Sequence, residues 1–425
     1  MSGMDERRAK LSPEKQALLA KRLSSLSTAA KAPAAPRESP VPEAEPPMDL
    51  SPGDTAAPVS REVWKTLMEI GEREARRLAV EPDLLGDAAR EPRWDEQSAA
   101  VLCTAFRSLG VFQEVGEEWT ISRLIDERGV LPKHRKVLRR WMETLKEEGL
   151  LEERGNAWVA LQPVPSPAFD AMLSDEHRRY YGSTLTKVLT GETHPLEFYL
   201  PGGSSSSVES SYRELPIFRY CNGICAGVLG GQVSALGEGT WLRMIEIGAG
   251  TGGTTASLLP LLPPDRTVFC FTDVSKFFTD LGRKKFQEYR FLRYRELDIE
   301  KDPLAQGYPE AGFDWVVAAH VLHATRDIAE TLEHVLRLLA PGGVLLLLEE
   351  TRFQRKYNFS MGFLPGFDHF EDFHLRPLHP LLSAAQWREA LLTAGFGDFA
   401  TFTEPGSAAD VMGVDVMIAR KPGGD

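Results

Sequence analysis

WLRMIEIGAGTGGTTASLL, residues 241–259, carries the strongest local signal in the chain. Its first half is apolar and typical of a buried strand that ends near Glu246, and a helix is expected to follow the glycines. Gly248, Gly250 and Gly252 let the backbone turn sharply and approach a ligand that lies over the helix N-terminus. Because glycine loops bind several classes of cofactor, the residues around this loop must identify its ligand.

The spacing of the loop narrows the choice of ligand. It reads Glu-x-Gly-x-Gly-x-Gly, which differs from the nicotinamide fingerprint, and no phosphate-binding lysine follows it, which excludes a P-loop. An acid at the strand end favours a ligand with a cationic group and no pyrophosphate, and S-adenosylmethionine is such a ligand. Asp273, about twenty residues after the loop, ends the next predicted strand, where its carboxylate can accept both ribose hydroxyls. Asp298 follows a third strand, near the expected position of the adenine amino group.

The composition limits the classes of function. With 425 residues and 42% apolar content, the chain can form one large domain or two of ordinary size. Its net charge of -12 argues against a surface that binds a nucleic-acid backbone. No stretch approaches the ~18 apolar residues that cross a bilayer, and the N-terminal stretch lacks the core of a signal peptide, so we expect a cytoplasmic protein without a membrane partner. The four cysteines give no metal-ligand framework and are expected to be buried thiols.

The chain divides into three predicted regions. Residues 11–23, LSPEKQALLAKRL, have a helix start and a stripe of leucines, although such a helix is too short to be stable alone. Pro, Ala and Ser dominate residues 24–58, which predicts a disordered linker. A short helix with one apolar face, joined by a disordered linker, indicates docking to a partner. The alternative is an N-terminal tail without stable structure. The regions are 1–58, a docking helix and linker; 59–237, a helical N-terminal lid region; and 238–425, the cofactor-binding core.

Part of the N-terminal region resembles a winged helix. Residues 119–161 have the order of helix, turn, amphipathic helix and hairpin that is typical of this module. Such modules often bind DNA, but here acidic residues between 143 and 153 dilute the basic residues between 133 and 140. A structural or lid role is therefore favoured, and no nucleic-acid partner is expected. Residues 201–207, PGGSSSS, are predicted to form a flexible joint.

Several stretches beyond the loop resemble a known family. They include SSYRELPIFRYCN, MIEIGAGTGGTT, FTDVS, VLHATRDIAETLEHVLRLLAPGGVLLLLEET and HPLLSAAQW, within about residues 195–400. In these stretches the chain resembles the class I S-adenosylmethionine-dependent methyltransferases, and more narrowly the methyltransferase domains of polyketide synthases and mixed polyketide–peptide synthetases. The resemblance implies an α/β fold with a Rossmann-like, seven-stranded sheet and a mainly helical, winged-helix-like N-terminal lid.

Two histidines, His320 and His323, follow an apolar strand that ends near residue 319. In this fold that strand lies beside residues 343–350, so groups at the two carboxyl ends can meet where ligands bind. His323 is then placed as a general base with Glu349 on its other ring nitrogen, and the resemblance assigns both to the family's catalytic dyad. His320 stands where relatives commonly have asparagine; it is assigned to the cofactor side, with a packed histidine as the alternative. A metal on the two histidines lacks a third ligand, so no metal is predicted.

The acceptor is less determined than the cofactor. Tyr212 and Asn222 match the family's substrate-side motif, although residues of these types are more often core. Relatives commonly have two tryptophans at Phe367 and Asp368, so the acceptor atom stays open, with an α-carbon favoured over a hydroxyl oxygen. The chain begins with methionine and contains no carrier, ketosynthase or adenylation segment, which predicts a discrete enzyme. We expect it to act in trans on a chain bound to an acyl or peptidyl carrier protein, docked through residues 11–23.

Two other functions compete with this one. The first is an O-methyltransferase that acts on the hydroxyl of a free small molecule and needs no docking helix. The second is a catalytically silent interaction module of a synthase. The intact glycine loop, together with Asp273, His323 and Glu349, argues against the silent module.

Overall fold

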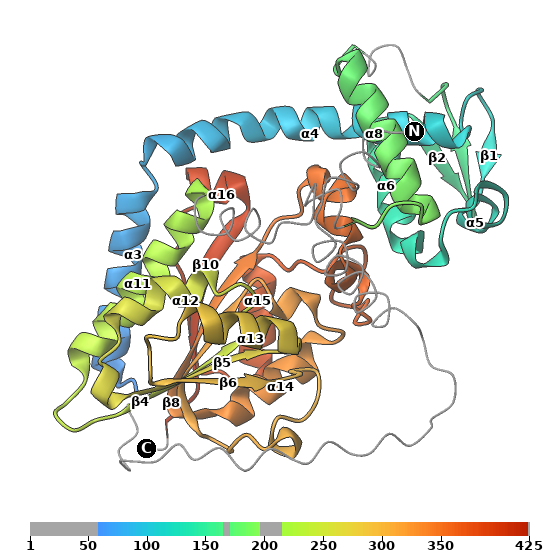
Figure 1. Ribbon diagram of the computed structural model, residues 1–425. Helices are drawn as coiled ribbons and strands as arrows, with labels where there is room; N and C mark the ends of the chain where they lie inside the picture. Colours follow the sequence, from blue (N-terminus) through green and yellow to red (C-terminus); the bar gives the residue numbers. More distant parts are fainter. Residues whose placement is uncertain (1–57, 165–170, 196–214, 424–425) are drawn as a thin grey trace, which may run out of the picture.

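A computed structural model describes residues 58–164, 171–195 and 215–423 of the chain. The predicted docking helix, the linker and the joint at residues 201–207 lie outside the described residues. Within them a large sheet with helices on both faces occupies one side of the molecule, and a smaller lobe lies at the far end of a long helix (Figure 1). None of the described helices is both long and apolar enough to cross a membrane.

The large sheet has seven strands in the order β6-β5-β4-β7-β8-β10-β9, which confirms the predicted α/β fold. Its first five strands in the chain are parallel, and β10 runs antiparallel to both of its neighbours. The strands are β4 (Leu242–Ile247), β5 (Thr267–Asp273), β6 (Leu292–Glu296), β7 (Phe313–Ala319), β8 (Leu339–Glu350), β9 (Asp398–Thr401) and β10 (Val414–Arg420). Strand order reverses at β4, with β5 on one side and β7 on the other, so a ligand is expected at the carboxyl ends of β4 and β7.

Alternate residues of the central strands face two different layers of helices. Ile245 and Val316 pack with α14 (Ile328–Leu338) and α15 (Ala384–Ala394). Met244 and Trp315 pack on the other face, in the same cluster as residues of α3 (Arg61–Leu78) and α11 (Pro216–Ala235). Both faces of the strands are therefore buried, as in other parallel sheets, and the runs of Val, Ile and Leu in the sequence reflect this. The helices α12 (Gly253–Leu258), α13 (Lys276–Lys285) and α16 (Ala408–Met412) complete this part.

The long helix α4 (Pro82–Leu109) joins this core to the smaller lobe. Its 28 residues span about 42 Å, and Figure 1 shows it crossing the top of the molecule. In the lobe, Phe106 of α4, Trp141 and Trp158 belong to a separate hydrophobic core. The other elements are α5 (Ile121–Arg128), α6 (Arg135–Glu147), α8 (Asp175–Thr190), β1 (Glu118–Trp119), β2 (Leu151–Arg154) and β3 (Ala157–Ala160).

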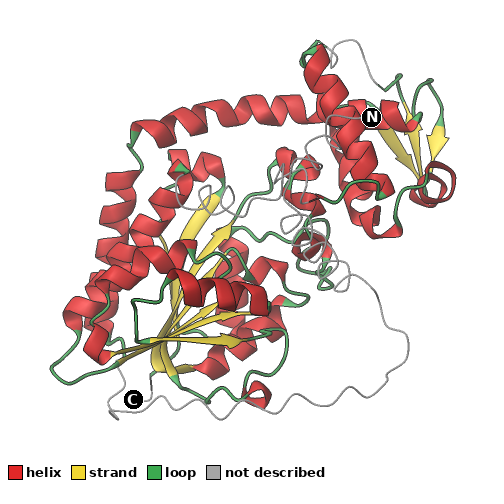
Figure 2. Ribbon diagram, viewed as in Figure 1, coloured by secondary structure: helices red, strands yellow, loops and turns green. Residues whose placement is uncertain are grey.

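The smaller lobe has the predicted winged-helix-like arrangement, with a three-stranded sheet in the order β1-β3-β2 that stands apart from the large sheet (Figure 2). The predicted boundary at residue 237 remains a prediction. The packing divides the N-terminal region differently, because α3 and α11 belong to the core of the large sheet and not to the core of the lobe.

Helix α6 of the lobe binds the segment that follows β8, which includes three short helical turns within residues 355–368. The Arg140 guanidinium forms an ion pair with Asp368 at 2.6 Å. The Lys136 ammonium group donates to the carbonyl oxygens of Asp368 and Phe370, at 2.7 and 2.6 Å. Two of the basic residues that a DNA-binding helix would present are thus used inside the protein, which favours the structural or lid role.

Candidate active site

The glycine loop joins β4 to α12 with three glycines at left-handed φ angles. The angles are 61° at Gly248, 55° at Gly250 and 71° at Gly252. A Cβ atom at Gly248 would lie 2.4 Å from the Val321 side chain, and one at Gly252 would lie 2.6 Å from the Phe286 ring. At Gly250 the nearest atom would be the Gly248 carbonyl oxygen, 3.9 Å away. The loop therefore packs tightly at its two ends and faces open space at Gly250.

A cavity of about 220 Å³ lies over this loop, at the carboxyl ends of β4 and β7. Its walls come from the loop itself, from the end of β7, and from α11 and α13. It brings together five of the predicted site residues, namely Glu246, Gly248, Gly250, His320 and Asn222. Phe218 and Phe278 also line it, and neither was predicted, although Phe278 lies shortly after Asp273 in the sequence.

The cavity contains two polar groups suited to a cationic ligand. Burial raises the pKa of the Glu246 carboxyl to about 8, although a 2.5 Å hydrogen bond from the Thr255 hydroxyl works in the opposite direction. A nearby cation would favour the ionised carboxylate. The Asn222 Oδ1 is buried and accepts no hydrogen bond from any described residue, so an acceptor is available to a bound donor. The open loop, the acid and this acceptor fit S-adenosylmethionine, which carries an ammonium and a sulfonium group.

The two other predicted acids lie outside the residues that line this cavity. One Asp273 oxygen accepts the Gly250 N–H at 3.0 Å, and the other accepts the Ser275 N–H at 2.8 Å. Burial raises the pKa of Asp273, against the effect of these two donors. Asp298 forms an ion pair with the Lys301 ammonium at 2.9 Å. Asp273 thus holds the glycine loop in shape, while the ribose and adenine contacts remain predictions.

His323 and Glu349 meet as the neighbouring strands β7 and β8 leave the sheet. The Nδ1 atom of His323 lies 2.5 Å from Glu349 Oε2, and both side chains are buried. Glu349 Oε1 accepts the backbone N–H groups of Val321, Leu322 and His323 at 3.2, 2.8 and 3.3 Å. Burial lowers the pKa of His323, but the carboxylates of Glu349 and Glu350 outweigh this effect and raise it above its ordinary value. The arrangement fixes the imidazole through Nδ1 and leaves Nε2 on the opposite side of the ring.

His320 lies at the turn between β7 and the dyad. Its Nδ1 atom is 2.9 Å from Glu350 Oε2, and its ring packs edge-to-face on Phe218 with centroids 5.1 Å apart. Its φ of 54° is in the left-handed region, which residues with a side chain rarely adopt. His320 lines the cavity, whereas His323 lies beyond the residues that line it.

A buried arginine that the sequence analysis missed holds the turn of His323 from behind. Arg376 donates to the carbonyl oxygens of His323 and Thr325 at 2.8 and 2.9 Å. Its guanidinium is paired with Asp372 at 2.6 Å, and both side chains are almost fully buried. No motif marks this arginine, because its position depends on how the loop after β8 folds back.

The predicted absence of a metal remains a prediction. His323, Glu349 and Glu350 offer ligand atoms that all lie within 4.8 Å of one another. In the structure the Glu349 oxygens accept hydrogen bonds from the turn and Glu350 is paired with His320, so a metal would have to displace these contacts. The predicted substrate residue Tyr212 lies outside the described residues.

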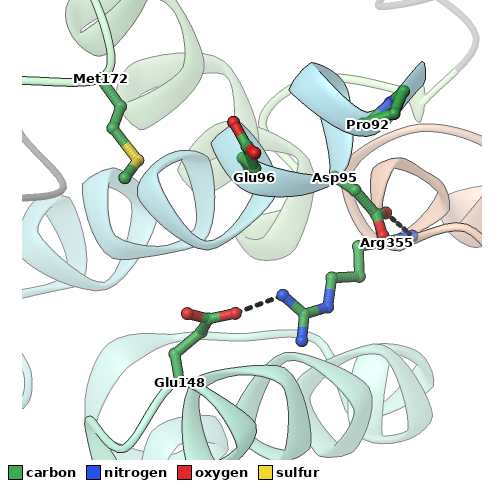
Figure 3. Close-up of a pocket in the computed structure, with 6 residues that line it drawn as sticks. All are labelled: Pro92, Asp95, Glu96, Glu148, Met172 and Arg355. Carbon is green, nitrogen blue, oxygen red and sulfur yellow. Dashed lines mark hydrogen bonds and ion pairs between the residues drawn. The ribbon is translucent and has the colours of Figure 1, made fainter.

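A second cavity, of about 360 Å³, lies where α4 and α6 meet the segment after β8. Figure 3 shows Arg355 reaching between Asp95 of α4 and Glu148, the residue that follows α6. The Arg355 backbone N–H donates to Asp95 at 3.1 Å, and its guanidinium is paired with Glu147 at 2.8 Å and with Glu148. These charged groups pair with one another and join the lobe to the core. The cavity over the glycine loop is therefore the better candidate for the active site.

Comparisons with known proteins match the part of the chain that contains this cavity. Residues 245–345, which include the glycine loop and the turn of His323, match a family described as a methyltransferase domain. The chain is 46% identical over 159 residues to a highly reducing polyketide synthase of Aspergillus nomiae. That alignment covers 36% of this chain and 6% of the synthase, so the chain spans a small part of this much longer relative.

Two solved structures extend the likeness to most of the chain. The CurJ carbon methyltransferase is 30% identical, with a TM-score of 0.76, and the alignment covers 87% of this chain and 100% of that structure. The trans-methyltransferase CalH, in complex with SAH, is 25% identical, with a TM-score of 0.53, and the alignment covers 78% of this chain and 92% of that structure. The similarity to the first structure includes the N-terminal lobe as well as the sheet.

Proposed function

The chain belongs to the carbon methyltransferases of polyketide synthases, which are S-adenosylmethionine-dependent enzymes of class I, and we propose that it methylates the α-carbon of a carrier-bound intermediate. In this proposal His323 is the general base and Glu349 orients it. The intermediate is a polyketide or mixed polyketide–peptide chain, and the enzyme is discrete and acts in trans.

The observation that carries the proposal is the 2.5 Å contact between His323 Nδ1 and Glu349 Oε2. A carboxylate on Nδ1 favours the tautomer with a lone pair on Nε2, and it stabilises the imidazolium that forms when Nε2 takes a proton. The backbone donors on Glu349 hold the carboxylate in place. The pKa of His323, raised by the two carboxylates, also favours proton capture near neutral pH.

Bound S-adenosylmethionine supplies an electrophilic methyl group on a sulfonium. The protein must therefore bind the cofactor, align the acceptor and remove one proton. In the proposed reaction the α-carbon proton between a ketone and a thioester would pass to His323 Nε2, and the electron pair left on carbon would form the new C–C bond. The bond between the methyl group and sulfur would break at the same time, with its electron pair left on the sulfur as a neutral thioether. The positive charge of the cofactor thereby ends on the imidazolium, so the net charge of the site is unchanged.

A carrier-bound acceptor is supported by the family and by the N-terminal sequence. The matched relatives are polyketide synthases, and the alignments cover only 6% and 15% of two of them. The trans-methyltransferase among the solved structures provides a precedent for a separate enzyme. The striped helix predicted at residues 11–23 remains the proposed docking element.

Mass spectrometry of a carrier protein tests the acceptor directly. A carrier loaded with β-ketoacyl chains is incubated with enzyme and S-adenosylmethionine, and the gain of one methyl group on the α-carbon is the expected result. The matched reaction uses a free phenol or alcohol. Faster methylation of the free hydroxyl would contradict the proposal and favour the O-methyltransferase, and binding of cofactor without turnover on any acceptor would favour the silent module.

Removal of residues 1–58 tests the docking helix separately. The shortened chain is expected to keep its turnover on a small β-keto thioester and to lose turnover on the cognate loaded carrier. Equal loss on both substrates would mean that this segment supports the folded enzyme and not the docking.

A further inference from the structure

A second histidine–carboxylate pair lies beside the proposed dyad. His320 Nδ1 is 2.9 Å from Glu350 Oε2, and the side chains are 11% and 4% exposed. The same Glu350 oxygen lies 4.0 Å from Nδ1 of His323. Glu350 therefore bonds to one imidazole and lies close enough to the other for a strong electrostatic interaction in a buried site.

The backbone at His320 indicates that its ring has a role. The φ of 54° would cost glycine nothing, whereas an L residue with a side chain is strained there. The strained position places the ring in the wall of the cavity and directs Nδ1 to Glu350. A glycine would make the same turn but could not hold Glu350.

The distribution of donors around Glu349 shows why a second carboxylate matters. Three backbone N–H groups and the His323 ring all bind Glu349, so its charge is shared among four donors. Glu350 is held mainly by one side chain. Burial raises its pKa, but the contact with His320 outweighs this effect and lowers it to about 2. The contact with His320 therefore favours the ionised form of Glu350.

The charged groups that face His323 come from three places. Glu349 and Glu350 end strand β8, and both favour the imidazolium. Arg376, from the loop after β8, opposes it and donates to the His323 carbonyl oxygen. His320 belongs to the same turn and faces Glu350.

We propose that Glu350, oriented by His320, is a second positioning carboxylate of the His323 base and sets the pH range in which that base accepts a proton. The proposal rests on the proposed function, since it takes His323 as the base. Glu350 touches neither acceptor nor cofactor in this role; it acts through His323 alone.

Titration of the imidazoles in the cofactor-free protein tests the proposal without any assay of turnover. Selectively labelled histidine is followed by NMR, and the His323 signal is assigned by its absence in His323→Ala. Removal of one negative charge disfavours the imidazolium, so Glu350→Gln is expected to lower the His323 midpoint by about one pH unit or more. The acidic limb of the pH profile of single-turnover rates, where His323 is still protonated and cannot act as a base, should move down by the same amount at saturating S-adenosylmethionine. Glu350→Asp keeps the charge but moves the carboxylate farther from His323, so it should lower the His323 midpoint by a smaller amount.

Asp415→Asn is the matched control. Asp415 is also a buried carboxyl, it lies opposite Glu349 on the neighbouring strand, and it accepts from the Thr401 hydroxyl at 2.6 Å. This variant should leave the His323 midpoint unchanged. An unmoved or raised midpoint in Glu350→Gln, or an equal shift in Asp415→Asn, would overturn the proposal. Retained turnover in His323→Ala would instead overturn the assigned base, whatever the titration shows.

Discussion

The turns that follow β4 and β7 leave the same edge of the sheet and both use left-handed backbone, but they do so with different residues. After β4 the three positions are glycines, and after β7 the position is His320. The glycine turn removes side chains and leaves a cavity over Gly250, whereas the histidine turn accepts strain of about 1–2 kcal/mol and places an imidazole in the cavity wall. In the proposed function, the first turn supplies space for the cofactor and the second turn supplies the base.

The largest expected effect is at the open glycine of the first turn. Gly250→Val should abolish detectable cofactor binding by calorimetry while circular dichroism shows a retained fold, because valine is strained at a φ of 55° and fills the cavity. Gly239→Val is the matched control, since Gly239 also has a left-handed φ, 74°, and open space around it, but does not line the cavity. Wild-type affinity in Gly250→Val, or the same loss in both variants, would contradict the assignment of the cavity.

The next largest effect is expected on turnover, when the proposed base His323 after β7 is removed. His323→Ala should bind S-adenosylmethionine normally and lose about 10²–10⁴-fold in single-turnover rate, the usual contribution of a positioned base. Glu349→Gln should lose less, because it keeps a hydrogen-bonding group on Nδ1 although it no longer favours the imidazolium. The double variant should be little worse than His323→Ala, since residues that act as one unit are not additive.

Two outcomes would contradict the assignment of His323. The first is a greater loss in His320→Ala than in His323→Ala. The second is loss of activity with EDTA and recovery with zinc, which would assign the cluster of His323, Glu349 and Glu350 to a metal.

A smaller effect is expected where the first turn is held to the next strand. Asp273→Ala should weaken cofactor binding by about 1–3 kcal/mol, the scale of hydrogen bonds to a charged group. The mutation would also remove the hydrogen bonds from the backbone N–H groups of Gly250 and Ser275, which hold the glycine loop in shape. Asp298→Ala, measured in the same way, tests the predicted adenine contact separately; Asp298 is paired with Lys301. Normal affinity in Asp273→Ala would place the ribose contact elsewhere.

The smallest effect is expected at His320 itself. His320→Ala should reduce turnover less than either His323→Ala or Glu349→Gln, because it leaves the dyad intact. Comparison with His320→Gly isolates the strain: the glycine variant should be more stable than the alanine variant by about 1 kcal/mol in thermal unfolding, since only alanine is strained at this φ. Equal stability of the two variants would mean that the turn carries no strain.

The sheet and the contact between His323 and Glu349 were predictable for a simple reason. Parallel strands put their carboxyl ends at one edge, so residues that follow apolar runs, such as Gly250, Asp273 and His323, had to lie near one another. Glu349 follows from the same argument, because β8 pairs with β7.

The parts that could not be predicted depend on segments without a regular repeat. Arg376 and its bonds to the turn of His323 arise from the path of the loop after β8. The pairing of Arg140 with Asp368 joins residues more than two hundred positions apart in the sequence, through side chains that look like ordinary surface charges. The packing of α3 in the core of the large sheet likewise depends on its tertiary contact with α11, which no local pattern encodes.

The burial of all four cysteines has a practical consequence for following the motions of this protein. Cys103 lies in the core of the small lobe, Cys221 and Cys225 lie in the core that α11 shares with the sheet, and Cys270 lies in a central strand on the other face. Burial raises the pKa of Cys225 and of Cys270 to about 12, so in the closed structure these thiols are hidden and protonated. Labelling by a thiol reagent therefore requires local opening. The labelling rates of the native cysteines would report separately on opening of the lobe and of each face of the sheet.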